Sequence, residues 1–486
     1  MKKNRPILTS FTALCLISGV LSAGAVENSG ISASPKLQNG HGNPLLDFHF
    51  TADPTAVEHD GRLYVYATND HQQYEEVGKM GKNSYEKIKS LVMMSTDDMA
   101  NWTYHGVIDV HAIAPWIMAS WAPSIVKRVE DDGQTHFYLY FSNSGYGTGV
   151  LTATSPVGPW SSPLGRSLVD ADSPGLGECK VPFDPGAVID DDGNGWLSIG
   201  AGKSVIMRLG KDMTSIDGEM VTLPAPHHFE ANELNYINGT YVYTYNTDWQ
   251  DHSDWPYEGD IPTECSMCYM TSKTPLDASS WAYGRNYLKN PRGYGFNASN
   301  NHTHLHKYKD RWYIFYHTTE LQKSFNTEGG FRNVCVDEIN VDELGVSIYM
   351  AEQTLAGPRQ IRPMDAFSLQ QAETTAATHG MSFVPAPDGV AGNMVATPVA
   401  GEGFTVVRGV SFGKVPAQCQ VTAAGQGTIE VRSGAPDGAL IASFDVNSDA
   451  PVLLSAAAGN ITAGTEGELF FLLNGRNLMF DNWKFK

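Results

Sequence analysis

Basic side chains are scarce in this sequence. Its 486 residues include 33 Lys and Arg against 53 Asp and Glu, which gives a formal net charge of −20 at pH 7. A protein that binds nucleic acid or an anionic membrane needs a basic face that attracts phosphate groups. We therefore expect neither of these partners, and the charge balance favours a soluble protein with an uncharged substrate.

Long apolar runs are also missing beyond the amino terminus. No later run approaches the ~18 apolar residues of a membrane span. The amino terminus differs, because basic residues at positions 2, 3 and 5 precede a short apolar stretch and small residues occupy 23–25. This pattern predicts a signal peptide over residues 1–25, cleaved after Ala25, and a secreted or periplasmic protein.

Cysteine is rare, with six residues in the chain. Five of them follow position 25, and an odd number leaves at least one thiol free. Cys265 and Cys268 form a Cys-x-x-Cys pair, but no second such pair or pair of histidines accompanies it, so we do not expect zinc there. Two interpretations stay open for this pair, namely a disulfide of an exported protein or two buried thiols.

Long helical periodicity is nearly absent, and a β pattern recurs five times instead. Each copy has a strand of some seven to ten residues, a turn such as Asp-Gly or Asn-Gly, and then alternating aromatic residues. An all-β repeat of this length is typical of a propeller, in which four-stranded blades surround an axis. We therefore expect a five-bladed β-propeller over residues 40–360, with copies that begin at Asp53, Ala122, Asp184, Glu230 and His302.

The first residues of these copies are expected to meet. In a propeller the innermost strand of every blade starts at the same end of the axis, so three carboxylates and the imidazole of His302 would share one funnel. Like charges gathered away from bulk water raise each other's pKa values. A fold keeps such an arrangement for a bound cation or for catalysis. A turn-starting Asp-Pro or a solvated edge glutamate explains one copy, but not three copies in phase.

Three carboxylates without an evident Ser–His or Cys–His pair indicate acid–base chemistry, and glycosidic hydrolysis is its main case. There one carboxylic acid protonates the leaving oxygen and one carboxylate activates water. Glu230 is the natural acid, because its neighbours Phe229 and Ala231 are apolar and favour the protonated form. Glu233 ranks below it, because an odd spacing along a strand places it on the opposite face.

Three segments resemble the signature blocks of glycoside hydrolase family 43: "ADPTAVEHDGRLYVY" with Asp53, "FDPGAVIDDDGNGW" with Asp184, and "HFEANELNYINGTYVYTY" with Glu230. The segments "SWAPSIVKR", "GVLTATSPVGPW", "YMTSKTP" and "WYIFYH" match in the same order, and residues 83–106 are most similar to the arabinoxylan arabinofuranohydrolase type. The resemblance covers about 43–355. It implies an inverting mechanism with Asp53 as general base, Glu230 as general acid and Asp184 as modulator of the acid's pKa, and it requires no cofactor for the chemistry.

The same resemblance points to further site residues. His302 in "NNHTHLH" takes the place of a family histidine that often lies beside a cation in the propeller channel, so it is either a metal ligand or a packed histidine. Arg332 in "GFRNVCVDEI" matches an arginine of the active site, the alternative being a surface arginine. Trp121 is a candidate for stacking on the sugar or for core packing. Trp249 and Trp255 lie in a polar loop, where exposed aromatic side chains indicate a substrate rim.

The character of the chain changes at about Phe367. Short alternating segments predict a β-sandwich of the jelly-roll type over residues 367–486, and their order resembles carbohydrate-binding module family 6. The resemblance implies a structural Ca²⁺ site at Glu373 and Asp481, although Gln371 stands where relatives often carry an acid. The segment "NSDAPVLLSAAAGN" lacks the stacking tryptophan of that family, and we expect Trp483 in the core, so this region is a structural module or a weakened binder.

Together these observations predict an exported, inverting exo-glycosidase that removes α-L-arabinofuranose from arabinoxylan or arabinan, with plant cell-wall polysaccharide or oligosaccharide as its partner. A β-xylosidase of the same family, a retaining β-fructosidase-like propeller and a non-catalytic sugar-binding propeller stay open as alternatives. Inversion requires the two acting carboxyl groups to lie about 6.5–9.5 Å apart, whereas about 5 Å indicates retention. The sequence does not indicate an oligomeric state.

Overall fold

The computed structural model describes residues 34–38 and 40–486, so the predicted signal peptide lies outside the described residues. Within the described part, strands dominate, as predicted, and no helix is long and apolar enough to cross a membrane. Two short α-helices are present, α1 (Asp70–Val77) and α2 (Val110–Ile113). The 3₁₀ turns are Pro35–Leu37, Ser144–Tyr146, Ala278–Ser280, Pro291–Tyr294 and Glu320–Lys323.

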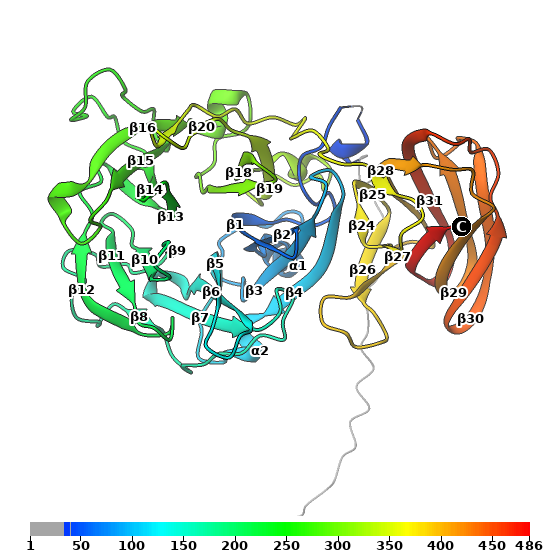
Figure 1. The fold of residues 1–486 in the computed structure, drawn as a ribbon, viewed down its shortest axis with the longest axis horizontal. Helices are drawn as coiled ribbons and strands as arrows, with labels where there is room; N and C mark the ends of the chain where they lie inside the picture. Colours follow the sequence, from blue (N-terminus) through cyan, green and yellow to red (C-terminus); the bar gives the residue numbers. More distant parts are fainter. Residues whose placement is uncertain (1–33, 39) are drawn as a thin grey trace, which may run out of the picture. The chain divides into compact units, whose positions relative to one another are not determined.

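Five antiparallel sheets surround one axis and confirm the five-bladed propeller (Figure 1). Strands β1, β5, β9 and β13 lie nearest the middle in Figure 1, and each following strand lies further out. The fifth blade has three strands where four were expected. Blade by blade, the strands are β1 (Ala52–His59), β2 (Arg62–Thr68), β3 (Ser90–Thr96), β4 (Trp102–Asp109); β5 (Trp121–Val129), β6 (Thr135–Ser142), β7 (Gly147–Ala153), β8 (Val169–Asp170); β9 (Gly186–Ile189), β10 (Gly195–Ile199), β11 (Val205–Leu209), β12 (Ile216–Thr222); β13 (His228–Ile237), β14 (Thr240–Thr247), β15 (Met267–Ser272), β16 (Ala282–Leu288); and β17 (His304–Tyr308), β18 (Arg311–Thr318), β19 (Asn333–Glu338).

The first hairpin of a blade forms where its turn chemistry predicts. The two residues between β1 and β2, Asp60 and Gly61, both have positive φ values of 49° and 75°. Two-residue turns with this backbone match the right-handed twist of the flanking strands, and they favour Asp, Asn and Gly. The same conformation occurs at Asn238-Gly239 and at Lys309-Asp310, so local sequence sets the register of three inner hairpins.

Apolar side chains hold neighbouring blades together. Tyr66 and Leu91 of the first blade are fully buried and belong to one cluster with Phe137 and Leu139 of the second blade. Each such side chain contributes roughly 1.5–3 kcal/mol when it leaves water. Comparable clusters join the other neighbouring blades, so the inner strands, which carry the candidate site, are fixed from both sides.

The segment before β1 closes the propeller and takes the place of the missing fourth strand of the fifth blade. The Leu45 N–H donates to the Val334 carbonyl at 2.9 Å, and the Thr51 N–H donates to the Arg332 carbonyl at 3.0 Å. The Asn43 side chain donates to the Val336 carbonyl and accepts from the Val336 N–H, both at 2.9 Å. The beginning and the end of the propeller are therefore joined edge to edge.

The carboxy-terminal region is a β-sandwich, as predicted. Trp483 is 1% exposed and packs against Phe471, with ring centroids 5.0 Å apart, which confirms its expected place in the core. The strands are β22 (Met364–Asp365), β23 (Gln370–Gln371), β25 (Ala377–His379), β26 (Met381–Pro385), β27 (Met394–Pro398), β28 (Glu402–Phe412), β29 (Gln418–Ser433), β30 (Leu440–Ala457) and β31 (Thr465–Phe485). A separate hairpin, β20 (Val341–Asp342) with β21 (Ser347–Ile348), follows the last blade.

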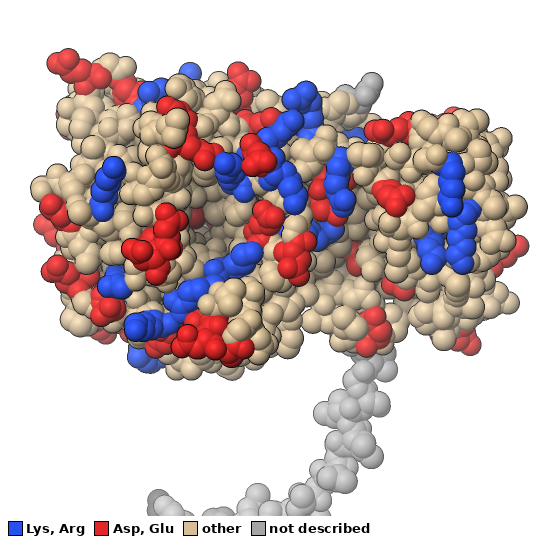
Figure 2. All heavy atoms as spheres, in the orientation of Figure 1, with Lys and Arg blue, Asp and Glu red and all other residues tan. Residues whose placement is uncertain are grey.

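One strand of this region joins the propeller. Strand β24 (Thr374–Thr375) pairs with β4, with Thr374 opposite Thr103 and Thr375 opposite Trp102. The Asn101 side chain also donates to the Arg408 carbonyl at 2.9 Å. On the face shown in Figure 2, acidic and basic side chains are interspersed.

Replacing Asn43 with alanine tests the closure. The Asn43 side chain is fully buried, and Asn43→Ala leaves the Val336 N–H and C=O without partners in the interior. We expect a loss of about 2–4 kcal/mol in the free energy of unfolding, measured by denaturant unfolding, whereas Asn447→Ala at an exposed strand position changes little. Equal stability of the two variants would contradict this account of the closure.

Candidate active site

The backbone at the start of the inner strands has an unusual conformation. Asp53, Ala122 and Asp184 have φ values of 49°, 40° and 50°, and each precedes a proline. Positive φ is costly for residues other than glycine and clusters at functional sites. The pairing register also shifts at this point in the first two blades, and such a bulge re-aims a side chain. The carboxylates of Asp53 and Asp184 are therefore both placed at the mouth of the funnel by a residue of positive φ that precedes a proline.

Glu230 does not occupy the equivalent position, which corrects the predicted phase of the fourth copy. Ala231 has the positive φ of 63° and is the counterpart of Asp53. In the pairing of the two innermost strands, Glu230 takes the position that Ala52 and Trp121 take in their blades. This position lies one residue before the one with positive φ. Comparison of the five copies in the sequence did not reveal this offset, because no proline follows Ala231 to mark it as the equivalent position. Glu230 nevertheless lies beside the other carboxylates, because Asp184 contacts the adjacent Ala231 N–H.

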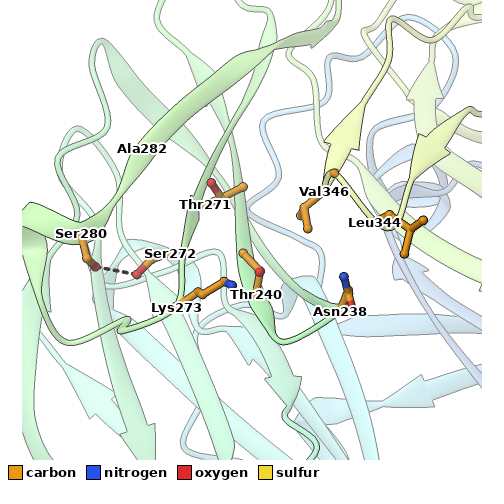
Figure 3. Close-up of a pocket in the computed structure, with 10 residues that line it drawn as sticks. Asn238, Thr240, Thr271, Ser272, Lys273, Ser280, Ala282, Leu344 and Val346 are labelled. Atoms are coloured by element: carbon orange, nitrogen blue, oxygen red, sulfur yellow. Dashed lines mark hydrogen bonds between the residues drawn. The ribbon is translucent and has the colours of Figure 1, made fainter.

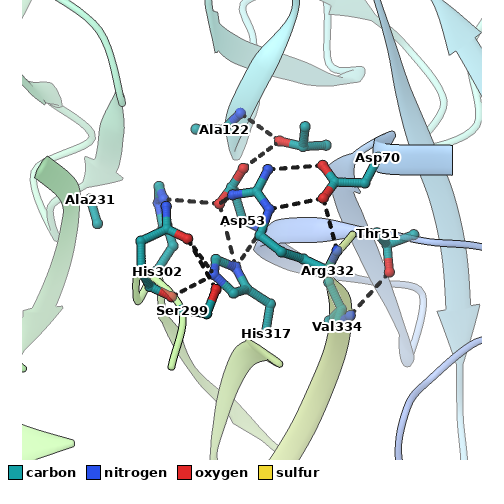
Figure 4. A network of polar contacts seen from close by, with 12 residues as sticks. Thr51, Asp53, Asp70, Ala122, Ala231, Ser299, His302, His317, Arg332 and Val334 are labelled. Carbon is teal, nitrogen blue, oxygen red and sulfur yellow. Dashed lines mark hydrogen bonds and ion pairs between the residues drawn. The ribbon is translucent and has the colours of Figure 1, made fainter. Parts of the chain in front are cut away.

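Asp53 is the carboxylate that stays ionised. Its Oδ1 lies 2.8 Å from Arg332 Nη1, and its Oδ2 accepts a hydrogen bond from Thr68 Oγ1 at 2.8 Å (Figure 4). Burial raises the pKa of Asp53. The charge of Arg332, the two nearby imidazoles and the Thr68 hydrogen bond together outweigh burial, and the pKa lies below its usual value. An ionised carboxylate in the funnel mouth can accept a proton from water.

Arg332 is buried, so the alternative of a surface arginine is wrong. Its Nε and Nη2 donate to the two oxygens of Asp70 at 2.9 and 2.8 Å, while Nη1 reaches Asp53. Its guanidinium also lies over the Tyr85 ring at 4.8 Å from the centroid. All three nitrogen positions are engaged within the protein, and this geometry makes Arg332 a positioning residue for Asp53. Asp70 begins α1 and carries no sequence signal that would have revealed this role.

Asp184 links the carboxylate group to the strand of Glu230. Its Oδ2 accepts from the Ala231 N–H at 2.9 Å, and its Oδ1 accepts from Ser142 Oγ at 3.3 Å. Burial raises the pKa of Asp184 well above its usual value, and the charges of Glu230 and Asp53 add to this effect. The side chain therefore fixes the backbone next to Glu230 and is electrostatically coupled to it.

Glu230 has the properties of an acid. Burial raises its pKa to about 7, and the charge of Asp53 acts in the same direction against the hydrogen bond from Asn300. Asn300 Nδ2 donates to Oε1 at 3.1 Å. The Asn300 carbonyl in turn accepts from His317 Nε2 at 2.8 Å, while His317 Nδ1 accepts from the Asp53 N–H at 3.2 Å. Asn300 and His317 thus connect Glu230 with Asp53, and neither was identified from the sequence.

His302 lies between two carboxylates. Its Nδ1 is 3.6 Å from Asp53 Oδ1 and 3.9 Å from Asp184 Oδ2. Burial lowers the pKa of His302 to about 4, so the ring is neutral near pH 7. His302 is therefore part of the carboxylate group in space, as its place at the start of the fifth copy predicted, and its role as a metal ligand stays a prediction.

Glu233 lies deeper than Glu230. It is 2% exposed, and its Oε1 is 3.1 Å from His304 Nδ1 of the fifth blade. The register shifts between Glu230 and Glu233, so simple alternation does not describe their relation. Burial raises the pKa of Glu233 well above its usual value, and it belongs to the packed interior below the mouth.

The tryptophan predictions have mixed outcomes. Trp121 is partly exposed, and its Nε1 donates to the Tyr85 carbonyl at 3.1 Å, beside the Arg332 network. Trp249 is 41% exposed in the loop after β14, as expected of a rim residue. Trp255 is only 8% exposed and packs on His227 with ring centroids 5.8 Å apart, so its prediction as an exposed rim residue is wrong.

The predicted calcium residues have the chemistry of a cation site. Glu373 is 1% exposed, and its Oε2 has no hydrogen-bond partner among the described residues. Burial raises the pKa of Glu373 to about 8, and Asp481 contributes further. Gln371 Oε1, on the strand paired with β31 next to Asp481, also lacks a partner. Carboxylate and amide oxygens are the ligands that Ca²⁺ prefers, so these residues fit the ion.

Two further features are the cysteine pair and a surface cavity. Cys265 and Cys268 are both buried free thiols in the described structure, which is the second of the two interpretations of this pair. A cavity of about 380 Å³ lies at the far end of β13 from Glu230, lined by Asn238, Lys273 and Leu344 among others (Figure 3). It is therefore separate from the carboxylate site.

The fold and the group of carboxylates are those of a glycoside hydrolase. The model of glycosyl hydrolases family 43 matches residues 41–346, and the chain belongs to this family. It is 34% identical to an arabinoxylan arabinofuranohydrolase of Bacillus subtilis (strain 168) over 92% of each chain. It is 31% identical to an arabinoxylan arabinofuranohydrolase of Paenibacillus polymyxa over 92% of this chain and 73% of the relative.

A solved structure is similar along nearly the whole chain. The crystal structure of a family 43 arabinoxylan arabinofuranohydrolase from Bacillus subtilis, in complex with cellotetraose, aligns with a TM-score of 0.85 at 31% identity. The alignment covers 94% of this chain and all of that chain. More distant relatives include proteins named xylosidase/arabinosidase.

The charge states of the site predict the pH dependence. As the predicted general acid, Glu230 is expected to act in its protonated form, so we expect kcat/KM to fall as the pH rises through about 7, the pKa to which burial raises this carboxyl. Glu230→Gln cannot titrate, and we expect it to lower kcat/KM by about 10²–10⁴-fold and to abolish the basic limb on an aryl glycoside. Glu76→Gln, at an exposed position of α1, serves as control. A basic limb that persists in Glu230→Gln would exclude Glu230 as the acid.

Proposed function

We propose that this protein is an inverting exo-glycosidase that removes α-L-arabinofuranosyl residues from arabinoxylan or arabinan. The observation that carries the proposal is the pairing of an ionised Asp53 with a Glu230 whose pKa is raised to about 7 in one funnel mouth. The names of the two relatives that span 92% of the chain support the choice of sugar. Plant cell-wall polysaccharide or oligosaccharide is the corresponding partner.

In the proposed mechanism Glu230 donates its proton to the glycosidic oxygen as the bond breaks. Asp53 accepts a proton from the water that attacks the anomeric carbon from the opposite face, which inverts its configuration. Arg332 holds Asp53 in place and keeps it ionised, and Asp70 fixes Arg332. Asp184 orients the backbone beside Glu230, because its Oδ2 accepts a hydrogen bond from the Ala231 N–H. Trp121, Trp249 and His302 are proposed to contact the sugar around this centre.

We also propose that different segments of the chain have different functions. Residues 40–360 form the catalytic domain, and 367–486 form a module related to carbohydrate-binding module family 6. Glu373 and Asp481, with Gln371, would hold a structural Ca²⁺, which neutralises two neighbouring carboxylates of the sandwich. Residues 1–25 are proposed to direct export and to be cleaved after Ala25.

The released product tests the proposed function. Incubation with wheat arabinoxylan, sugar-beet arabinan and xylo-oligosaccharides is expected to release arabinose, and NMR of the first product is expected to show the inverted anomer. We expect Asp53→Asn to abolish turnover with the fold retained, because the base is lost, whereas Asp60→Asn in the exposed turn of the same hairpin retains activity. Released xylose instead indicates the β-xylosidase, retained configuration indicates the β-fructosidase-like alternative, and binding without release indicates a sugar-binding propeller.

The calcium proposal has its own stability test. Because an ion that binds only the folded state stabilises it by RT ln(1 + [L]/Kd), Ca²⁺ at 100 times Kd adds about 2.7 kcal/mol, and chelation lowers Tm. In Glu373→Gln we expect the Ca²⁺-dependent shift in Tm to disappear, while Glu402→Gln, at an exposed position of β28, keeps it. A Tm of the wild type that does not respond to Ca²⁺ or to a chelator refutes the site.

A further inference from the structure

Two imidazoles and a carboxylate converge at a place that the acid–base chemistry does not use. His227 precedes β13, Asp248 follows β14, and His252 lies in the loop that Asp248 begins. One ligand atom from each of these three side chains lies within 4.8 Å of the others, and no other such group occurs in residues 34–38 and 40–486. Their types and number are those of a protein metal centre.

In the neutral form of His252, the hydrogen-bond partners of the ring leave a lone pair directed at an anion. His252 Nδ1 lies 2.9 Å from the Pro262 carbonyl, which can only accept, so Nδ1 carries the proton. In the neutral ring Nε2 then presents its lone pair to Asp248 Oδ1 at 3.0 Å. His252 is 3% exposed, whereas the Asp248 side chain is 28% exposed, so the imidazole is kept from water while the carboxylate is partly open to it. A cation bound by both Nε2 and the carboxylate removes the repulsion between this lone pair and the anion.

His227 faces the second carboxylate oxygen of Asp248. Its Nε2 lies 2.9 Å from Asp254 Oδ1 and its Nδ1 lies 3.4 Å from Asp248 Oδ2, so a neutral ring can donate to only one of these two carboxylates. In the tautomer with the proton on Nε2, the ring donates to Asp254 and presents the Nδ1 lone pair to Asp248. Metal-binding histidines usually donate their second ring N–H to a carbonyl or carboxylate, which fixes the tautomer and the ring orientation. Pro262 and Asp254 supply these outer partners for His252 and His227.

We propose that His227 Nδ1, His252 Nε2 and a carboxylate oxygen of Asp248 bind a divalent transition-metal ion, with Zn²⁺ as the favoured ion. Two imidazoles and one carboxylate suit Zn²⁺, whereas Ca²⁺ takes oxygen ligands alone. Three protein ligands leave a fourth tetrahedral position for water. The site is distinct from the carboxylate centre and from the proposed Ca²⁺ residues of the sandwich.

The ion would tie the rim loop to the strand that carries the acid. The Asp248 N–H donates to the His227 carbonyl at 2.8 Å, and the Cys265 N–H donates to the Asp248 carbonyl at 2.8 Å, so Asp248 stands at the neck of the loop. His252 lies within this loop, and Trp249 projects from it with 41% exposure. Glu230 follows His227 by three residues. The metal would therefore hold the loop in place beside the funnel mouth, whichever sugar the enzyme cleaves.

Calorimetric titration with Zn²⁺ tests the proposal. The full chain is used without a histidine tag, after chelator treatment and with Ca²⁺ in excess, so that the sandwich site is saturated. We expect one Zn²⁺ per chain in the wild type and at least a tenfold weaker affinity in His252→Gln and in Asp248→Asn. His136→Gln is the matched control, because His136 and Asp132 form a His–Asp contact of 2.9 Å without a third ligand, and we expect it to bind as the wild type does.

Two results overturn the inference. One is the absence of saturable Zn²⁺ binding by the wild type, which would assign the contacts to doubly protonated histidines. The other is unchanged affinity in both His252→Gln and Asp248→Asn. Asp248→Asn keeps the size of the side chain, and circular dichroism confirms that each variant is folded before titration. Because the readout is metal affinity, failure here leaves the released-sugar test of the hydrolase function unaffected.

Discussion

The ion pair between Arg332 and Asp53 is the interaction on which the site depends. Three carboxylic acids share one mouth, two of them buried and Glu230 half-buried. They repel each other when ionised, so their protons must be distributed unequally. Arg332 settles this distribution by stabilising one charge, that of Asp53. Burial and the charge on Asp53 then raise the pKa of Glu230 and of Asp184. Asp70 holds the guanidinium from behind, and this division into a base and an acid follows from one buried cation.

The propeller provides the rigidity that this distribution requires. The inner strands of the first four blades each have a residue of positive φ at or near their start, and apolar packing between blades prevents the backbone from relaxing. The segment around Asn43 joins the first residues of the propeller to β19, and this strand begins directly after Arg332. Closure of the ring and placement of the Arg332 guanidinium are thus structurally connected. The loop after β14 is held at the same rim by Asp248, where the proposed Zn²⁺ would complete its attachment.

Much of this arrangement was predictable because it rests on local chemistry. Asp-Gly and Asn-Gly turns identify the hairpins, and Pro after Asp53 and Asp184 marks equivalent strand starts. The resemblance to family 43 then assigned roles to the carboxylates. The prediction was wrong where an offset or burial entered: Ala231 takes the equivalent position beside Glu230, and Trp255 packs inward on His227.

The sequence by itself determined the β-propeller, the sandwich and the identity of the acids at the funnel, because strand alternation and turn preference act between near neighbours in the chain. The tertiary structure decided which acid is charged and what holds it. Arg332 and Asp53 are 279 residues apart, and Arg332 and Asp70 are 262 apart. Electrostatic stabilisation depends on distance in space and on exclusion of water, and neither quantity exists until the ring of blades has closed.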